Sequence, residues 1–374
     1  MTRLARRHPV TFVEEPIFTA DAQLQLKRRR VEQGDITIVT PHLPQGIAPA
    51  QADHQTRRLL DKLISEMPGP GLLLWFYTPM ALPLVDPRRG YVRVYDCMDE
   101  LASFDGAPPV LRTREDELLR NVDIVFTGGM SLYEAKRERH ANVHAFPSAV
   151  DFAHFAKARS DLPDPSDQAG IPGPRFGFFG VLDERLDREL IRAVAALRPD
   201  WHFIFLGPVA KIASESLPHA ANIHYLGAKS YRDLPTYVAN WDVATMPFAR
   251  NAATRFISPT KTPEYLSCGL PVVSTPITDV VRSWGHLDAV KIAGDPAAFV
   301  AEADAALKLS RTAGRWREQA DHELAGISWD RTAASMEALI ATEATRLAEK
   351  APAGAVPARA SNLHLSVPKG EARV

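Results

Sequence analysis

The chain has little of several features that mark other classes of protein. Its 374 residues include two cysteines, Cys97 and Cys268, and neither has a nearby cysteine partner. This argues against a disulfide framework and against a zinc site of paired cysteines, and it is typical of a reducing cytoplasm. No run of about eighteen apolar residues is present, so no membrane-spanning helix is predicted. The formal net charge of −1 argues against a general nucleic-acid binder.

What the chain does have is a regular alternation of short apolar runs and amphipathic stretches. This is the pattern of parallel sheets with crossover helices. We therefore expect an α/β fold of two Rossmann-like, doubly wound domains, with a ligand cleft at the carboxyl ends of their strands. The predicted strands are Val10–Val13, Ile36–Val39, Leu72–Tyr77, Val92–Tyr95, Ile124–Thr127, Phe176–Phe179, His202–Leu206, Val243–Pro247, Val272–Ser274 and Val290–Ile292.

Composition also predicts where the domains begin and end. Residues 1–155 form the first domain, and 156–174, which are dense in Pro, Asp, Ser and Gly, form a linker. The second domain is predicted over 175–328, and a long Ala-rich helix over 329–350. Residues 351–374 are rich in Pro, Ala and Gly without periodicity, so we expect a disordered tail there.

The most informative stretch is residues 258–274, which read S-P-T-K-T-P-E-Y-L-S-C-G-L-P-V-V-S. Thr262 is a helix-capping type, Pro263 suits the first helical position, and Gly269 suits the residue just past a helix end. An apolar run follows. The stretch therefore predicts a loop, a short helix, a glycine turn and a buried strand.

The start of this predicted helix combines a cation with hydroxyls and an acid. Free N–H groups, the helix dipole and the charge of Lys261 would favour an anion there. Glu264, in the first turn, offers two acceptor oxygens to a pair of vicinal hydroxyls. Phosphate and diol together describe a nucleotide; the alternative is an ordinary capped helix with an acid in its first turn. The hydroxyl-bearing residues are Ser258, Thr260 and Thr262.

The same stretch resembles the K-x-x-E-Y-L-x-x-G-x-P-V-V signature of bacterial family-4-like retaining glycosyltransferases, the "glycosyl transferases group 1" of the GT-B fold. The resemblance implies that Glu264 binds the ribose of a nucleotide-diphospho-sugar, with UDP or GDP the expected nucleotide. Most members carry a second Glu, eight residues earlier, that contacts the donor sugar; here that position is Phe256. The matching residues are Lys261, Glu264, Tyr265, Leu266, Gly269, Pro271, Val272 and Val273.

The resemblance extends from about residue 10 to about residue 348. It implies that the second domain holds the nucleotide-sugar, that the first faces the acceptor, and that the final helix crosses back to the first domain. In the family a further strand precedes the helix that leads into Val10–Val13. We therefore expect the first sheet to lack its central strand, between Val10–Val13 and Leu72–Tyr77, and the chain as given to transfer sugar poorly.

A second candidate segment of the donor site is F-G-F-F-G-V-L-D-E-R-L-D, residues 176–187. Gly180, at the strand end, would let the backbone approach a ligand closely, and Arg185 could reach a phosphate. The family has a Gly-Arg pair and then a Lys here. Gly180 matches, Val181 replaces the Arg, and Arg185 lies about where the Lys belongs, so Lys261 would supply the missing charge. The alternative is a solvated charged loop made of Asp183, Glu184, Arg185 and Asp187.

Three more residues are assigned to the donor by resemblance or position. The backbone near Leu226 and Gly227 would contact the nucleobase, although a strand end and a glycine turn explain both residues without a ligand. Arg255, on a loop, is a further phosphate candidate. No acidic pair with D-x-D spacing ends a strand in this domain, so no metal and no resident cofactor are implied, and the cations would serve as the electrophile.

On the acceptor side, Y-D-C-M-D-E at residues 95–100 ends a predicted strand and resembles a segment seen in one bacterial subgroup. Asp96 or Asp99 could orient or deprotonate an acceptor hydroxyl, or could cap the following helix instead. The basic run Lys27–Arg30 could attract anionic lipid headgroups weakly, as a lipid-linked acceptor would require. A solvated helix face is the alternative for that run.

Together these features predict a cytoplasmic, metal-independent retaining glycosyltransferase, with weak peripheral contact at the inner face of the plasma membrane. It would move a sugar from a nucleotide-diphospho-sugar to a sugar or lipid-linked sugar hydroxyl in surface-polysaccharide or glycolipid synthesis. Arg185 and Lys261 would stabilise the leaving diphosphate, and Asp96 or Asp99 would serve the acceptor. The alternatives are a non-catalytic or truncated nucleotide-sugar-binding protein, and an epimerase or phosphorylase on the same fold.

Overall fold

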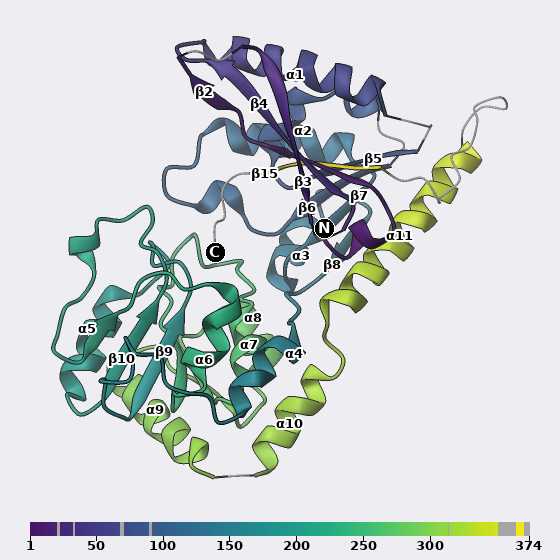
Figure 1. Cartoon of the computed structure of the whole chain (residues 1–374). Coiled ribbons are helices and arrows are strands. Elements are labelled where there is room, and N and C mark those ends of the chain that lie inside the picture. Colours follow the sequence, from purple (N-terminus) through teal and green to yellow (C-terminus); the bar gives the residue numbers. More distant parts are fainter. Residues whose placement is uncertain are drawn as a thin grey trace. The chain divides into compact units, whose positions relative to one another are not determined.

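The computed structural model describes residues 1–20, 23–32, 34–67, 71–89, 92–312, 314–350 and 364–369 (Figure 1). The chain divides into two compact units. Unit 1 contains Met1–Ala102, Gly106–Phe146 and the described residues from Asp330 to Lys369. Unit 2 contains Pro147–Trp329 together with the short segment Ser103–Asp105. Each unit has its own sheet and its own buried apolar core.

In the described part of the chain, unit 1 is built on a nine-stranded sheet of order β2-β4-β1-β15-β5-β6-β7-β8, with β3 paired to the other edge of β4. All of its pairs are parallel except β3–β4. The five strands predicted for this region are confirmed, and β5, β6 and β7 are buried almost throughout, as parallel strands covered on both faces are. The strands are β1 Val10–Glu14, β2 Ile17–Thr19, β3 Gln25–Val31, β4 Ile36–Pro44, β5 Leu72–Phe76, β6 Val92–Cys97, β7 Ile124–Thr127, β8 Val143–Ala145 and β15 His364–Lys369.

Crossover helices cover this sheet, and one of them comes from the end of the chain. Helix α11 places apolar side chains into the same core as Trp75 and Phe126. The predicted return of the final helix to the first domain is therefore confirmed. The α-helices of unit 1 are α1 Pro49–Ser65, α2 Val110–Asn121, α3 Met130–Lys136 and α11 Trp329–Lys350; the 3-10 turns are Leu4–Arg6, Pro79–Leu84, Pro87–Arg89 and Leu101–Ser103.

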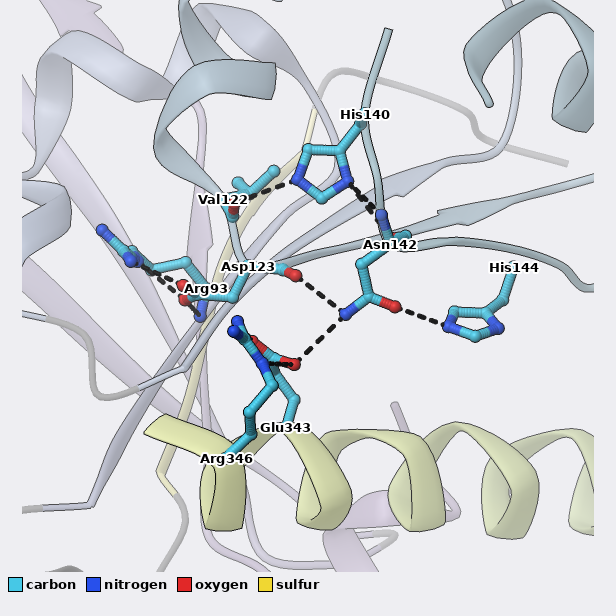
Figure 2. Close-up of polar contacts among 8 residues, drawn as sticks. All are labelled: Arg93, Val122, Asp123, His140, Asn142, His144, Glu343 and Arg346. Atoms are coloured by element: carbon cyan, nitrogen blue, oxygen red, sulfur yellow. Dashed lines mark hydrogen bonds and ion pairs between the residues drawn. The ribbon is translucent and has the colours of Figure 1, made fainter. Parts of the chain in front are cut away.

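A buried polar contact fixes α11 on the sheet (Figure 2). Glu343 is 4% exposed, and it accepts a hydrogen bond of 3.3 Å from Asn142 Nδ2 and pairs with Arg346 on its own helix. Asn142 also donates to the Asp123 carbonyl at 3.0 Å, and its Oδ1 lies 2.8 Å from His144 Nε2. Because a buried carboxylate needs such partners, this contact fixes the position of α11 along the strands.

The central slot of the first sheet differs from our expectation. The slot between β1 and β5 is filled by β15, the yellow strand of Figure 1, which pairs in parallel with both neighbours. Thus Val10 lies opposite Leu365, and Leu72 opposite His364. The expectation of an unfilled slot was wrong, as was that of a tail with no ordered element, because two unpaired strand edges in the middle of a sheet provide a strong pairing template. Residues 351–363 and 370–374 lie outside the described residues.

The basic run Lys27–Arg30 lies on β3, not on a helix as we considered. β3 is an edge strand, and its basic side chains are exposed. Arg28 lies 3.0 Å from Glu66, and two further arginines lie 3.9 Å from acids, Arg29 from Glu14 and Arg30 from Asp35. Charged side chains on an edge strand discourage pairing with other chains, which explains this run without a ligand.

The described residues of unit 2 form a six-stranded, fully parallel sheet of order β11-β10-β9-β12-β13-β14. The five strands predicted here are confirmed, and β11 joins them at one edge. The strands are β9 Arg175–Phe179, β10 His202–Leu206, β11 Ile223–Tyr225, β12 Val243–Met246, β13 Val272–Ser274 and β14 Val290–Ile292. The order of the strands changes direction beside β9, so the loops that follow β9 and β12 lie where such sheets bind ligands.

Short helices surround this second sheet. α5 packs against α9 over one part of it, while α7 packs against α4 and α10. None of the helices in the described residues is both long enough and apolar enough to cross a membrane. The α-helices are α4 Phe152–Phe155, α5 Arg188–Leu197, α6 Leu234–Val238, α7 Lys261–Ser267, α8 Thr278–Trp284, α9 Pro296–Ser310 and α10 Arg315–Leu324; the 3-10 turns are Ala156–Arg159, Ser214–Ser216 and Tyr231–Asp233.

The pairing of β15 leads to a testable prediction. Deleting residues 361–374 should lower the thermal unfolding midpoint of the chain and promote oligomers, because β1 and β5 each lose a partner, at about 1 kcal/mol per lost backbone hydrogen bond. A synthetic peptide of residues 361–371 should restore the midpoint. The control changes residues 354–360 to Gly and Ser and keeps β15. A truncated chain that unfolds like the full chain would contradict the placement of β15.

Candidate functional site

At the centre of the candidate site, the side chain of Lys261 passes directly over Gly180. Gly180, at the end of β9, has φ +141°, and a Cβ at this position would lie 2.5 Å from Lys261 Cε and 2.8 Å from its Nζ. Only glycine leaves room for this side chain, which also places Nζ 5.5 Å from the centre of the Phe178 ring. Gly180 and Lys261, which the sequence analysis assigned to the donor site from two separate segments, are thus in direct contact.

A buried hydrogen bond holds this contact in place. The backbone N–H of Phe179 donates to the Tyr265 hydroxyl at 3.0 Å, and Tyr265 is fully buried. Helix α7, which carries Tyr265 and Lys261, is therefore tied to the end of β9, which carries Gly180. Our sequence analysis assigned no role to the hydroxyl of Tyr265. Tyr265 follows Glu264 in an apolar helix, which indicates that its side chain is buried. A buried tyrosine hydroxyl needs a hydrogen-bond partner, so this position could have predicted the bond.

Glu264 lies one helical turn beyond Lys261, and its Oε2 accepts a 3.3 Å hydrogen bond from Thr260 Oγ1. Burial raises the pKa of Glu264, and the nearby Lys261 charge opposes that rise. Burial likewise lowers the pKa of Lys261, while Glu264 opposes this. Lys261 and Glu264 are therefore both largely buried, and each stabilises the charge of the other. An ammonium beside a carboxylate suits a ligand with both anionic and hydroxyl groups.

The start of α7 differs from our expectation. The helix begins at Lys261 with Thr260 at the N-cap position, and no side chain caps it. Thr262 is fully buried, and its hydroxyl lies 3.5 Å from Met246 Sδ, so it neither caps the helix nor faces a ligand. The prediction placed the helix start two residues too late, because Pro263 tolerates any position in the first turn. Gly269, with φ +78°, ends the helix as predicted.

Arg185 is held by a neighbouring acid that the sequence did not identify. Asp183 is 4% exposed and accepts from Arg185 Nε at 2.9 Å and from Nη2 at 2.6 Å. Both residues contribute to the electrostatic environment of Lys261. The structure thus brings Arg185, Lys261 and Gly180 together, but Asp183 occupies one edge of the guanidinium. The D-x-R spacing was the available signal for this pair.

The alternative of a solvated charged loop at 183–187 is wrong. Besides the buried Asp183, Asp187 caps α5 by accepting from the Leu190 N–H at 2.9 Å. The side chain of Glu184 is 9% exposed. Backbone bonds join the loop to its neighbours, from Ala249 N to Arg185 O at 2.7 Å and from Leu182 N to Pro208 O at 2.9 Å. The loop is therefore a rigid edge of the site.

The other donor candidates lie at varied distances from this centre. Gly207 follows β10, packs against the Gly180 carbonyl and donates its N–H to the Gly227 carbonyl at 2.9 Å, so Leu226 and Gly227 adjoin the same edge of the sheet. The Ser258 carbonyl accepts a 3.0 Å bond from Ser148 Oγ. Arg255 is exposed, and its guanidinium carbon lies 5.0 Å from the centre of the Phe256 ring.

The acceptor candidates belong to unit 1. Asp96 is 4% exposed at the end of β6, where Oδ2 accepts from Trp75 Nε1 at 3.1 Å and Oδ1 has no hydrogen bond. Burial raises its pKa to about 7, and the Trp75 bond opposes that rise. Asp96 therefore caps no helix, contrary to the alternative we considered. An acid that titrates near neutrality suits proton transfer, although its carboxylate is enclosed in this structure.

The rest of the Y-D-C-M-D-E segment is fixed by a buried lysine. Lys136 has no exposed surface, and its Nζ lies 2.7 Å from Glu100 Oε2 and 2.6 Å from Glu115 Oε1. Asp99 is partly exposed, and its carbonyl accepts a 3.5 Å contact from Cys97 Sγ. Of the two acceptor acids, Asp99 is thus the more accessible. Among the described residues, no group of three or more His, Cys, Asp and Glu side chains is placed to hold a metal ion.

Comparison with known proteins agrees with this geometry. A family model described as Glycosyl transferases group 1 matches residues 173–309, which lie in unit 2. TuaH of Bacillus subtilis (strain 168), named as a glycosyltransferase of teichuronic acid biosynthesis, is 27% identical over 243 residues. That match covers 59% of this chain and 60% of TuaH, so the chain spans less than two thirds of the length of that relative.

Solved structures show the same fold. A sucrose-phosphate synthase from Thermosynechococcus elongatus has a TM-score of 0.64 at 13% identity, covering 92% of this chain and 100% of that one. A trehalose-6-phosphate structure from E. coli, bound with UDP-2-fluoro glucose, also scores 0.64 at 13% identity, covering 91% and 94%. HepE from Anabaena, solved with UDP and glucose, scores 0.59 at 13% identity, covering 92% and 99%. The fold is of the GT-B class, and residues 173–309 match the group 1 glycosyltransferase model.

The contact between Lys261 and Gly180 leads to a direct prediction. Gly180→Ala should lower the free energy of unfolding by about 1–3 kcal/mol, because the new Cβ displaces Lys261 and the φ of +141° is strained for an L residue. Gly170→Ala is the matched control, because a Cβ there meets nothing within 4 Å. Urea unfolding of both variants checks this. Equal stability of the two would contradict the crossing of Lys261 over Gly180.

The burial of Asp96 predicts a pH dependence of stability. Its pKa rises from 3.8 to about 7 on folding, so the folded chain holds a proton that the unfolded chain releases. This stabilisation is complete below about pH 4 and is lost as the pH rises through about 7, at about 1.4 kcal/mol per pH unit. Asp96→Asn should remove the effect.

Urea titrations of the wild type and of Asp96→Asn at pH 5 and pH 8 measure this difference. We expect the wild type to lose stability relative to the variant by about 3 kcal/mol between these two values. If the wild type and Asp96→Asn differ in stability by the same amount at pH 5 and pH 8, then Asp96 is ionised in the folded chain at both pH values.

Proposed function

We propose that this chain is a retaining glycosyltransferase that transfers a sugar from a nucleotide-diphospho-sugar to a hydroxyl of a sugar or a lipid-linked sugar. The donor is a UDP- or GDP-sugar, and no metal takes part. The observation that carries the proposal is the Lys261 ammonium, which crosses Gly180 at the carboxyl end of β9. This is the edge where open α/β sheets bind nucleotides.

The chemistry of the site matches the two ends of a nucleotide-sugar. Lys261 and Arg185 supply positive charge for a diphosphate, and Asp183 orients the guanidinium. Glu264, adjacent to Thr260, supplies acceptor oxygens for the ribose diol. The edge formed by Gly207 and the Leu226–Gly227 turn would contact the nucleobase.

The same groups support the bond-breaking step. As the bond from the sugar to the diphosphate breaks, the ring becomes oxocarbenium-like and negative charge grows on the leaving phosphate. Arg185, which Asp183 holds, and Lys261, which lies over Gly180, are already in position. They can therefore stabilise that charge without reorganising. Their contribution is larger in the transition state than in the ground state, so it should appear mainly in the rate.

The acceptor side rests on Asp99 and Asp96. Asp99 is the accessible acid, suited to orient a hydroxyl, while the neutral-range pKa of Asp96 suits proton transfer if the segment opens. The relative named for teichuronic acid biosynthesis supports an acceptor in surface-polysaccharide synthesis. A peripheral membrane contact would be weak, because the arginines of β3 have acidic neighbours.

A second candidate is a non-catalytic nucleotide-sugar-binding protein. Phe256, which stands where the family has a donor-sugar Glu, favours it, as does the enclosed carboxylate of Asp96. Incubation with a UDP- or GDP-hexose and analysis of released nucleotide and glycosylated product separates the two candidates. Binding without turnover would favour the second.

The role of Glu264 predicts a loss of nucleotide affinity. Glu264→Ala should weaken binding of nucleoside diphosphate and nucleotide-sugar alike, by about 2–3 kcal/mol, because a charged pair of hydrogen bonds to the ribose is lost. Calorimetry measures both affinities. Glu302→Ala, on α9, is the control and should bind like the wild type. Unchanged diphosphate affinity in a folded Glu264→Ala chain would reject this assignment.

A further inference from the structure

Glu184 is a buried carboxylate without a hydrogen-bond partner among the residues that the structure describes. Its side chain is 9% exposed, and neither Oε1 nor Oε2 accepts a hydrogen bond from any described residue. The ammonium of Lys211 faces it, with Nζ 3.9 Å from Oε1, beyond hydrogen-bond distance. Buried carboxylates are normally fully paired, so this one requires an explanation.

The backbone around Glu184 is fixed on both sides. Its own carbonyl accepts a 3.0 Å bond from Asn251 Nδ2, and the next residue, Arg185, accepts from the Ala249 N–H at 2.7 Å. On the other side, Ala210 N–H donates to the Leu182 carbonyl at 3.1 Å. The lack of partners is thus not a consequence of a loosely held loop. Glu184 also adjoins Arg185, whose guanidinium belongs to the proposed phosphate site.

The facing residue is unusual as well. Lys211 has φ +60°, and among the described residues it is the one non-glycine with a positive φ. Strained backbone of this kind concentrates at ligand sites. Lys211 follows β10 and Glu184 follows β9, so both lie at the carboxyl ends of adjacent parallel strands. Two independent irregularities therefore face each other at the ligand-binding edge.

We propose that Glu184 and Lys211 form a hydroxyl-binding subsite that takes the sugar ring of the donor. This inference rests on the proposed function and adds the residues that hold the sugar. A carboxylate accepts from two hydroxyls, and an ammonium donates to one, so the pair fits a neutral polyol. A phosphate would be repelled by Glu184, and the ribose already has Glu264, so the hexose is the part of the donor that remains.

The test compares nucleotide-sugar with the nucleotide alone. Glu184→Gln should weaken binding of UDP-glucose or GDP-mannose about tenfold or more, while UDP or GDP binds within about twofold of the wild type. Glu189→Gln is the matched control, because Glu189 is an exposed acid on the adjacent α5 that pairs with Arg192. Calorimetry on the full chain measures all four affinities.

A second readout separates binding from a structural role. Neutralising an unpartnered buried carboxylate should raise the thermal midpoint of the ligand-free chain, whereas removing a structural contact would lower it. Equal losses for nucleotide and nucleotide-sugar, or no loss for either, would overturn the proposal, as would a lowered midpoint. A wild-type chain that binds neither ligand would reject the proposed function itself, and this subsite with it.

Discussion

The ammonium of Lys261 lies where a side chain on Gly180 would have to be, and the arrangement of the candidate site in unit 2 depends on that contact. The strand end can approach the helix this closely because residue 180 has no Cβ, and the Tyr265 hydroxyl keeps the two elements at that separation by binding the Phe179 N–H. The same contact places a partly desolvated cation beside Glu264. Sequence, packing and electrostatics thus support the proposal of one site there for a ligand with phosphate and hydroxyl groups.

Unit 1 depends on a different constraint, because β15, from near the end of the chain, completes its sheet. β15 fills the slot between two strands from the start of the chain, and α11 supplies part of the core beneath. The buried contact of Glu343 with Asn142 fixes the position of α11. Folding of this unit therefore requires contacts between residues more than three hundred positions apart, such as Val10 and Leu365, which makes the closure entropy large.

Much of this could be predicted from the sequence. Apolar runs located ten strands, and two short motifs singled out Gly180 and Lys261, which the structure brings into contact. The rest was decided by tertiary contacts that local patterns do not report. The charged edge strand β3 resembled a solvated helix face. The residues of β15 do not by themselves predict a strand, and only the open slot between β1 and β5 indicates that one is needed. Asp183 and Glu184 resembled solvated charges, because burial of an acid becomes visible only when neighbouring loops are in place.

The claim that Lys261 forms the phosphate site is tested most directly by one calorimetric titration. The full chain and its Lys261→Ala variant are titrated with the diphosphates of uridine, guanosine, adenosine and thymidine, and with the corresponding nucleosides. We expect one diphosphate to bind the wild type, and the variant to lose about tenfold or more of that affinity while its weak affinity for the nucleoside is unchanged. Equal diphosphate affinity in both chains, or no binding of any diphosphate to the wild type, would contradict the account.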